Sequence, residues 1–485
     1  MKKYICFLQL LVMASFISGC SHFGALKVDE ELVGNMISLN ANGETFNIEY
    51  IKNLCEKGTT SSETCTKENL LNIHINQIFN NLQKIEKENS KIEILLFIHG
   101  GLVPKRKAAI EAKKIAKEIN EDNKKRKLFE PYVYPIFVNW ESSMSASYKN
   151  HLLRIRQGEK RSKLFGWSTS PFYLIADTGR ALTRLPITYT YQTYNMIKPV
   201  KTYNNSDLSI FNKNFYTEGK NNGHGISLGE NRINNFSKII NKSTYVFPGV
   251  FKIITTPILD MVGKSSWDNM LRRTKTLFRT PGDFKINASG NSMNQEPNGG
   301  LSKLMRMLRK LKVSKNADKF SVTLMGHSMG TIVASEILRK YSENEDFDYD
   351  NIVYMAAATS IRDFETSVVP YLKAHSESNF YNLTLHPYAE ENENTGYDFL
   401  PRGSLLVWLD DFATIPATPA DKTLGKWNNA IRAWPYIPNE IRSRITLKGF
   451  GVVNDSKSNI TDPQKHGQFN DVKFRFWRHK FREIN

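Results

Sequence analysis

A serine between two glycines is the pattern with the clearest chemical meaning in this chain, at Gly326-His327-Ser328-Met329-Gly330. The residues before it, Ser321 to Met325, are mostly apolar or β-branched and predict a strand. The residues after it have the spacing of an apolar helix face, at Val333, Ala334, Ile337 and Leu338. A serine on a tight turn from strand to helix projects its hydroxyl at the end of a sheet, where free N–H groups of the helix face any oxyanion formed. The pattern therefore predicts that Ser328 is a nucleophile.

A second motif, His99-Gly100-Gly101-Leu102, follows an apolar run from Ile92 to Ile98 that predicts a buried parallel strand. Glycines have no Cβ, so backbone N–H groups can approach a substrate oxygen closely. With the serine motif, this stretch resembles the α/β-hydrolase superfamily, and its lipase- and esterase-like serine hydrolases in particular. The resemblance implies an α/β fold with a mostly parallel sheet flanked by helices. It also implies an oxyanion hole made by the N–H groups of Met329 and Gly101 (or Leu102).

The resemblance further implies a triad in the chain order nucleophile, acid, histidine. A serine hydroxyl needs a base within hydrogen-bond reach, and a carboxylate to orient that base. Of the ten histidines, His466 is the expected base, because it lies in a glycine-containing loop after the last predicted strand. His386 is the alternative base, whereas His375 and His479 are expected at the surface.

The acid of this triad is expected in the loop after the strand that ends at Leu385. Glu390 is the acidic residue closest to that strand end, and it is the favoured candidate. The other candidates are Glu391, Glu393, Asp398, Asp410, Asp411 and Asp363.

Alternating strands and helices surround these motifs. Further strands are predicted at 132–140, 351–357, 379–385 and 443–450, and helices at 70–85, 108–119 and 301–311. This alternation predicts a mostly parallel sheet covered on both faces. Residues 36–51 alternate apolar and polar side chains around Asn42-Gly43, which predicts an antiparallel hairpin at the sheet edge. Trp140 ends its strand, where it either lines the pocket or packs in the core.

The region from Glu141 to Glu296 interrupts this alternation. The resemblance implies an insertion that caps the active site, and the alternatives are a separate binding domain or a partly disordered excursion. The expected organisation is a hydrolase core formed by 32–140 and 297–485, with a cap or lid formed by 141–296. Aromatic side chains of the insertion offer apolar surface for an acyl chain or a bilayer, among them Phe172, Tyr173, Tyr189, Tyr191, Phe247 and Phe251.

The N-terminus reads as a targeting segment of residues 1–19, with Lys2 and Lys3 before an apolar run that is too short to span a membrane. Ile17-Ser18-Gly19-Cys20 resembles the bacterial lipobox. The resemblance implies a lipoprotein with lipidated, palmitate-bearing Cys20 as its mature N-terminus and a tether at 20–31. Ser21, where Asp would signal inner-membrane retention, favours the outer membrane facing the periplasm. The alternative is an ordinary secretory signal with an unrelated cysteine.

The remaining cysteines indicate the redox compartment of the protein, and its net charge indicates the kind of surface that it meets. Once Cys6 is removed and Cys20 is lipidated, Cys55 and Cys65 are an even pair in an oxidising compartment, which favours a disulfide over two free thiols. The net charge is +18, from 66 Lys and Arg against 48 Asp and Glu. Such a charge favours anionic membrane surfaces, or simply solvated lysines. No zinc-finger spacing or RNA-binding motif indicates nucleic acid.

These patterns predict a membrane-anchored serine hydrolase of acyl (carboxylic) esters, with lipids among its substrates. The alternatives are an amidase, peptidase or thioesterase on the same triad, or a non-enzymatic envelope lipoprotein on a hydrolase scaffold. No metal-ligand motif and no phosphate-binding glycine loop occurs in the sequence, so no cofactor is expected.

Overall fold

The computed structural model describes most of the chain. The described residues are 30–45, 53, 67–127, 129–153, 155–156, 159–160, 162–197, 224–228, 249–279, 299–312, 317–341, 348–393, 402–450 and 462–484. The expected signal segment, Cys20, Cys55, Cys65 and Asp398 lie outside these residues.

An eight-stranded sheet forms the centre of the molecule, and all neighbouring strands pair in parallel. Its order across the sheet is β1-β3-β2-β7-β8-β9-β10-β6. The coarse prediction of an α/β protein with a parallel sheet is therefore confirmed. The strands are β1 (Met36–Leu39), β2 (Ile92–Ile98), β3 (Tyr132–Trp140), β6 (Gly225–Leu228), β7 (Phe320–His327), β8 (Asn351–Met355), β9 (Asn379–Leu385) and β10 (Ile445–Phe450). A separate small hairpin pairs β4 (Ile155–Arg156) with β5 (Glu159–Lys160).

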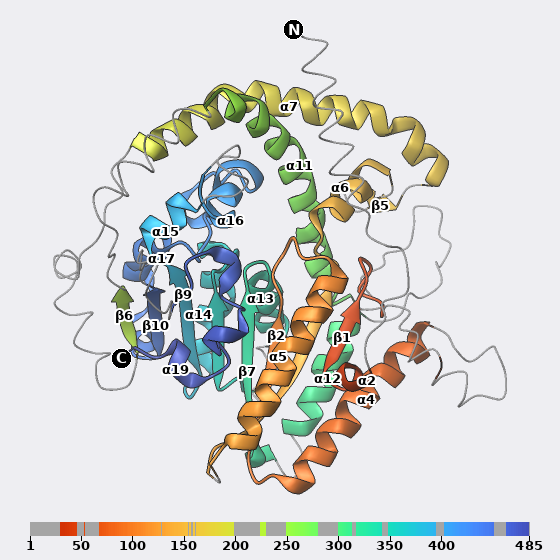
Figure 1. Cartoon of the computed structure of the whole chain (residues 1–485), viewed down its shortest axis with the longest axis vertical. Coiled ribbons are helices and arrows are strands. Elements are labelled where there is room, and N and C mark those ends of the chain that lie inside the picture. Colours follow the sequence, from red (N-terminus) through yellow and green to blue (C-terminus); the bar gives the residue numbers. More distant parts are fainter. Residues whose placement is uncertain are drawn as a thin grey trace.

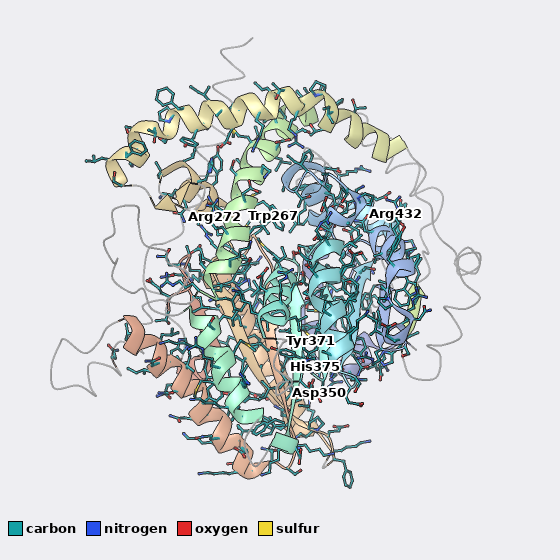
Figure 2. All side chains as sticks on the ribbon, turned by 180° about the vertical axis from the view of Figure 1, so that it is seen from behind. Trp267, Arg272, Asp350, Tyr371, His375 and Arg432 are labelled. Carbon is teal, nitrogen blue, oxygen red and sulfur yellow. The ribbon has the colours of Figure 1, made fainter. Side chains whose placement is uncertain are left out.

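Helices cover both faces of this sheet. Helix α5 (Lys105–Lys125) lies over one face (Figure 1), and α4 (Lys67–Glu88), α12 (Gly300–Lys312) and α14 (Ile361–Ala374) lie over the other (Figure 2). Amphipathic spacing explains their packing, because the apolar side chains of α12 at Leu301, Leu304, Met305 and Leu308 are all buried.

The other core helices are mostly short, and most of them lie in the connections between strands, whereas α2 precedes β1 and α19 follows β10. They are α2 (Glu30–Val33), α13 (Gly330–Tyr341), α15 (Pro387–Asn392), α16 (Leu405–Trp408), α17 (Trp427–Ala433), α18 (Asn439–Arg442) and α19 (His479–Arg482). Short 3-10 or π turns are η3 (Ala317–Lys319), η4 (Leu409–Ala413), η5 (Pro419–Asp421), η6 (Trp434–Tyr436), η7 (His466–Gln468) and η8 (Val472–Phe474).

The predicted edge hairpin at residues 36–51 is described only in part, because an antiparallel bridge joins Leu39 to Thr45 across the turn and residues 46–51 lie outside the described residues. β1 pairs with β3 in parallel, although it is an edge strand as expected. The turn itself is present, because Gly43 has φ of 73° and Asn40 accepts hydrogen bonds from the N–H groups of Asn42 and Glu44. All four residues of β1 are buried, which suits a strand covered on both faces better than a half-exposed hairpin strand.

The region between β3 and α12 forms long helices above the carboxyl ends of the strands. It contains α6 (Met144–Leu153), α7 (Lys163–Ile197) and α11 (Gly249–Thr276), and α7 arches across the top of the molecule (Figure 1). Pro171 and Pro186 lie inside α7, and prolines within a helix cause bends of this kind. None of the helices in the described residues combines the length and the apolar composition that crossing a membrane requires.

This region is not wholly separate from the core. β6 joins the main sheet beside β10, at a place where the sequence pattern predicts no strand. Trp267, Met270, Leu277 and Phe278, at and after the end of α11, belong to the main apolar core. Tertiary pairing therefore ties the region 141–296 to the sheet at two places.

Candidate active site

The turn between β7 and α13 holds Ser328 in the left-handed backbone region, with φ of 51°. This conformation costs a residue with a Cβ about 1–3 kcal/mol, and it needs support from its surroundings. The N–H of Ser328 donates to the carbonyl of Met355 at 2.8 Å, and its own carbonyl accepts from the N–H of Ala358 at 3.1 Å and from Oγ1 of Thr331 at 2.6 Å. Neighbouring β8 and the loop that follows it therefore hold the serine in this strained position.

The two motif glycines allow this turn to pack against β2 and α13. A Cβ at Gly330 would lie 2.2 Å from the carbonyl oxygen of Ile98. A Cβ at Gly326 would lie 2.9 Å from the backbone of Thr331. Contacts this short exclude any side chain at either position without movement of the backbone.

His466 is the histidine that the structure brings to Ser328. Its Nε2 lies 2.9 Å from Oγ of Ser328, and its ring is only 5% exposed. Burial lowers the pKa of His466 well below its usual value, and nearby His327 lowers it further. The imidazole is therefore neutral at physiological pH and able to accept the serine proton.

Backbone contacts hold His466 in this position. Its N–H donates to Oε2 of Glu393 at 2.8 Å, and its carbonyl accepts from Nε2 of His327 at 3.1 Å. Burial also lowers the pKa of His327 to about 4, so this ring is neutral and carries its proton on Nε2. The serine motif thus supplies a support for the base as well as the nucleophile.

The acid candidate Glu390 lies in α15, after β9, and only 2% of it is exposed. Oε1 of Glu390 accepts a hydrogen bond from Oγ of Ser404, and burial raises the pKa of Glu390 to about 8. Among the described residues, Oε2 of Glu390 and Nδ1 of His466 are both buried without a hydrogen-bond partner. The structure places no hydrogen bond between these two residues.

The other described acids have different surroundings. Asp410 accepts from the N–H of Thr423 and from Nδ2 of Asn429, and it fixes the loop between η4 and α17. Asp363 pairs with Arg339 at 3.0 Å on α13. Glu391 lies in α15 and Asp411 in η4, whereas Glu393 contacts the backbone of His466 rather than its ring.

The alternative histidines lie elsewhere. His386 caps α15, where its Nδ1 accepts from the N–H of Tyr388 at 3.1 Å. The expectation of a surface position for His375 is wrong, because its ring is stacked 4.2 Å from that of Tyr371 and pairs with Asp348. In Figure 2, Tyr371 and His375 lie below Trp267, farther from the arch of α7.

The expected oxyanion loop follows β2 and packs directly on the serine turn. A Cβ at Gly100 would lie 2.9 Å from Cβ of Ser328, and one at Gly101 would lie 3.1 Å from Cβ of Met329. Within the described part of the chain, no hydrogen bond occupies the N–H of Gly101 or of Met329. The N–H of Leu102 donates to the carbonyl of Ser142 at 2.8 Å, so Gly101 rather than Leu102 offers a donor.

His99 and Ser142 fix the orientation of this loop. The backbone N–H of Trp140 donates to Nε2 of His99 at 3.2 Å, so the proton of His99 is on Nδ1, which donates to the carbonyl of Gly100 at 2.7 Å. Oγ of Ser142 donates to the same carbonyl at 3.1 Å. A trans peptide points its C=O and N–H in opposite directions, so these bonds turn the N–H of Gly101 away from His99 and Ser142.

Two contributions to the site were not predicted from the sequence. Trp140 is fully buried, and its indole donates to the carbonyl of His99 at 3.1 Å, so it supports the loop from the core. Ser142 follows the same strand by two residues. A polar residue directly after the carboxyl end of a central strand is the signal that could have identified it.

A pocket that is partly open to solvent lies beside Ser328. One face of α11 lines it through residues spaced three or four apart, and α6, α16 and η4 complete the wall. None of its lining side chains is charged. The lining residues are Gly101, Leu102, Met144, Leu259, Gly263, Trp267, Met270, Ser328, Met329, Leu405, Trp408, Leu409, Phe412 and Ala413.

No cluster of three or more His, Cys, Asp or Glu side chains among the described residues is arranged to hold a metal ion. Comparison of the chain with models of known protein families, with curated proteins and with solved structures finds no match. The geometry of the site is therefore the observation from which a function can be argued.

Proposed function

We propose that this protein is a serine hydrolase that cleaves acyl (carboxylic) esters, built on an α/β-hydrolase type of fold. The observation that carries the proposal is the 2.9 Å contact between Oγ of Ser328, in a strained turn, and Nε2 of neutral His466. A hydroxyl paired with a neutral imidazole is the arrangement that nucleophilic catalysis by serine requires.

In the proposed reaction, Oγ of Ser328 attacks the ester carbonyl carbon while Nε2 of His466 takes the hydroxyl proton. The carbonyl electron pair moves to oxygen, and the N–H groups of Gly101 and Met329 stabilise the oxyanion. The intermediate then expels the alcohol, which receives its proton from His466, and Ser328 is left acylated. Water attacks the acyl group with His466 again as base, which releases the acid and restores the serine.

Glu390 is the proposed carboxylate that orients His466. It and Nδ1 of His466 are buried polar groups at the same edge of the sheet, and a hydrogen bond between them would satisfy both free atoms. As His466 gains positive charge during the reaction, an adjacent carboxyl is favoured in its ionised form. Kinetics of Glu390→Gln and Glu393→Gln compare two of the acid candidates. A larger loss of kcat in Glu393→Gln would remove Glu390 from this role.

The pocket supports an apolar acyl group as the part of the substrate that is bound. Its walls are aliphatic, methionine and tryptophan or phenylalanine side chains, and they offer no charged partner to a peptide or polar amide. Ester cleavage is therefore favoured over amidase or peptidase activity.

A fluorophosphonate probe tests the serine chemistry. The wild type should be labelled, Ser328→Ala should not, and Ser321→Ala is the matched control at the far end of β7. Rates on p-nitrophenyl esters of rising chain length, on peptides and on thioesters then identify the substrate class. An unlabelled wild type with no hydrolysis would instead support a non-enzymatic lipoprotein, and faster cleavage of peptides or thioesters would overturn the ester assignment.

The proposed setting is the bacterial envelope, with lipid-bearing Cys20 as the anchor in the outer membrane, facing the periplasm. Membrane fractionation tests this placement. Cys20 lies outside the described part of the chain, so the proposal rests on the sequence. Palmitate labelling should be lost in Cys20→Ala, and a labelled variant would count against the anchor. Peptide mapping without reduction tests the Cys55–Cys65 disulfide, which two alkylated thiols would refute.

A further inference from the structure

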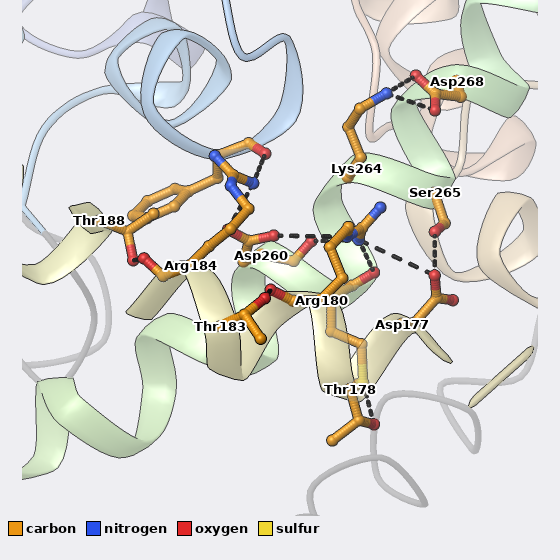
Figure 3. A network of polar contacts seen from close by, with 12 residues as sticks. Asp177, Thr178, Arg180, Thr183, Arg184, Thr188, Asp260, Lys264, Ser265 and Asp268 are labelled. Carbon is orange, nitrogen blue, oxygen red and sulfur yellow. Dashed lines mark hydrogen bonds and ion pairs between the residues drawn. The ribbon is translucent and has the colours of Figure 1, made fainter. Parts of the chain in front are cut away.

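Helix α7 carries its charged side chains toward the protein and its large apolar side chains outward. Asp177, Arg180 and Arg184 are turned toward α11, and Asp177 is only 8% exposed. Their partners include Oγ of Ser265, which donates to Asp177 at 3.0 Å (Figure 3). This is the reverse of an ordinary surface helix, which turns its charges to water.

The opposite side of α7 is the outer face, defined here by six exposed side chains. Leu164 is 87% exposed, Phe172 72%, Ile175 68% and Trp167 65%, and Ile187 and Leu182 are exposed to a lesser degree, at 61% and 48%. The helix follows the top of the molecule, away from the sheet (Figure 1). Exposed apolar patches of this extent mark an interaction surface.

The hydroxyl groups exposed on α7 hydrogen-bond within the helix. Oγ1 of Thr169 donates to the carbonyl of Phe165 at 2.6 Å, and Oγ of Ser170 donates to that of Trp167 at 3.0 Å. Thr183 and Thr190 donate in the same way to carbonyls three and four residues earlier. These groups keep their hydrogen bonds when water is removed, so the surface can enter an apolar medium at low cost.

The polar contacts of Asp260 attach α7 firmly to the wall of the pocket. Asp260 of α11 is fully buried and accepts from Nη1 of Arg184 at 2.7 Å, with Arg180 beside it (Figure 3). Arg184 also donates to the carbonyl of Phe412, which lines the pocket. Whatever binds the outer face is thus held at a fixed position relative to the pocket.

Basic residues flank α7 in the sequence: Lys160, Arg161 and Lys163 at its start, and Lys198 and Lys201 beyond its end. A long uncharged face with Trp, Phe and Leu, on a helix that has basic residues next to it in the sequence, is the composition of helices that lie in a membrane interface. Each such residue adds attraction to anionic lipid headgroups.

We propose that the outer face of α7 docks on the surface of a bilayer that contains anionic phospholipid. Because the other side of α7 packs on α11, the helix axis lies in the plane of the membrane. This contact is distinct from a lipid on Cys20, and it does not depend on the serine chemistry.

The test places the full chain on vesicles of phosphatidylcholine and phosphatidylglycerol, with and without bromine on the acyl chains. Bromine quenches tryptophan only on close approach, and the emission of Trp167 is isolated as the difference between the wild type and Trp167→Phe. We expect this emission to be quenched by the brominated lipid. A chain held by its N-terminus alone leaves Trp167 unquenched, and that result would overturn the proposal.

A second comparison uses the double variant Ile175→Glu/Leu182→Glu and the matched control Phe129→Glu, whose side chain is 88% exposed away from α7. The double variant should bind the vesicles about tenfold or more weakly, as measured by the quenching of Trp167, and the control should keep the wild-type affinity. Circular dichroism checks the fold of each variant. The quenching of Trp167, measured as the difference between the wild type and Trp167→Phe, does not depend on the glutamate variants. A different outcome would be that Trp167 is not quenched, the wild type sediments as a dimer and the double variant sediments as a monomer. That outcome would assign the outer face to a second copy of the chain and reject the membrane proposal.

Discussion

Oγ of Ser328 and Nε2 of His466 lie 2.9 Å apart, although 138 residues separate them in the sequence. The serine is held by the turn after β7, and the histidine by its backbone contacts with Glu393 and His327. Two separate sets of local contacts therefore create one chemical pair.

Comparing Ser328→Gly with Ser328→Ala separates the cost of the backbone strain at residue 328 from the loss of catalysis. Both variants lose the nucleophile and should lose hydrolysis by about a thousandfold or more. Because φ of residue 328 is 51°, Ser328→Gly should be more stable than Ser328→Ala by about 1 kcal/mol. Chemical denaturation measures the difference, and equal stability would show that the turn relaxes without its serine.

Ser142→Ala should weaken the oxyanion loop without removing a reacting group. The variant loses the 3.1 Å hydrogen bond to the carbonyl of Gly100, while the backbone contact with Leu102 stays. We expect kcat to fall about tenfold with little change in KM, because the loop stabilises charge that develops only in the transition state. Ser143→Ala is the neighbouring control, and an equal effect there would point to general loosening of the loop.

Glu390→Gln should change how stability depends on pH. The pKa of Glu390 is about 8 in the folded protein, against 4.5 for an ordinary glutamate. Between these two values the folded state holds a proton that the unfolded state has released, so stability falls as pH rises through this window. The glutamine variant should lose less stability from pH 5 to pH 8 in thermal unfolding. Exposed Glu365→Gln is the control, and parallel curves for all three proteins would contradict the buried position of Glu390.

Gly263→Leu should narrow the pocket. A Cβ at Gly263 on α11 meets no atom within 4 Å, and this residue lines the pocket beside Ser328. The variant should fold and should shift the preference toward esters with shorter acyl chains, because the added side chain occupies the space of the substrate. Gly179→Leu on α7 is the matched control, since a Cβ there is equally free of contacts. An unchanged chain-length profile in Gly263→Leu would mean that the acyl group binds elsewhere.

Asp260→Ala should loosen the contact between α7 and α11. Removing this fully buried carboxylate takes away the negative charge that faces Arg184 and Arg180, which should cost about 3 kcal/mol of stability. Asp268→Ala on the same helix removes an ion pair with Lys264. Because the side chain of Asp268 is 46% exposed, we expect the stability to change by less than about 1 kcal/mol. Urea unfolding compares them, and similar losses in both variants would show that Asp260 is not the main tie.

Much of the sheet could be predicted from the sequence. The predicted bounds of β2, β3 and β9 match the structure. β2 was recognisable as an apolar run with marked ends, as is typical of strands buried on both faces, and β9 by the alternation of its side chains. The turn at Ser328 was also readable, since two glycines between a strand and a helix are a local requirement. His466 was identified through chain order rather than through its contacts.

Only the tertiary structure decided how distant segments meet. Nothing in the local pattern of Gly225–Leu228 indicates its pairing with β10. The hairpin pattern around Asn42-Gly43 likewise does not indicate that β1 pairs in parallel with β3. The same holds for Leu102, whose N–H is taken by Ser142, and for the charges of α7, which turn inward toward Asp260. The sequence by itself determined most core strands and helices and the chemical types at their ends, because these depend on neighbouring residues. Pairing order, burial and hydrogen-bond partners depend on contacts between residues far apart in the chain, and these exist only once the chain has folded.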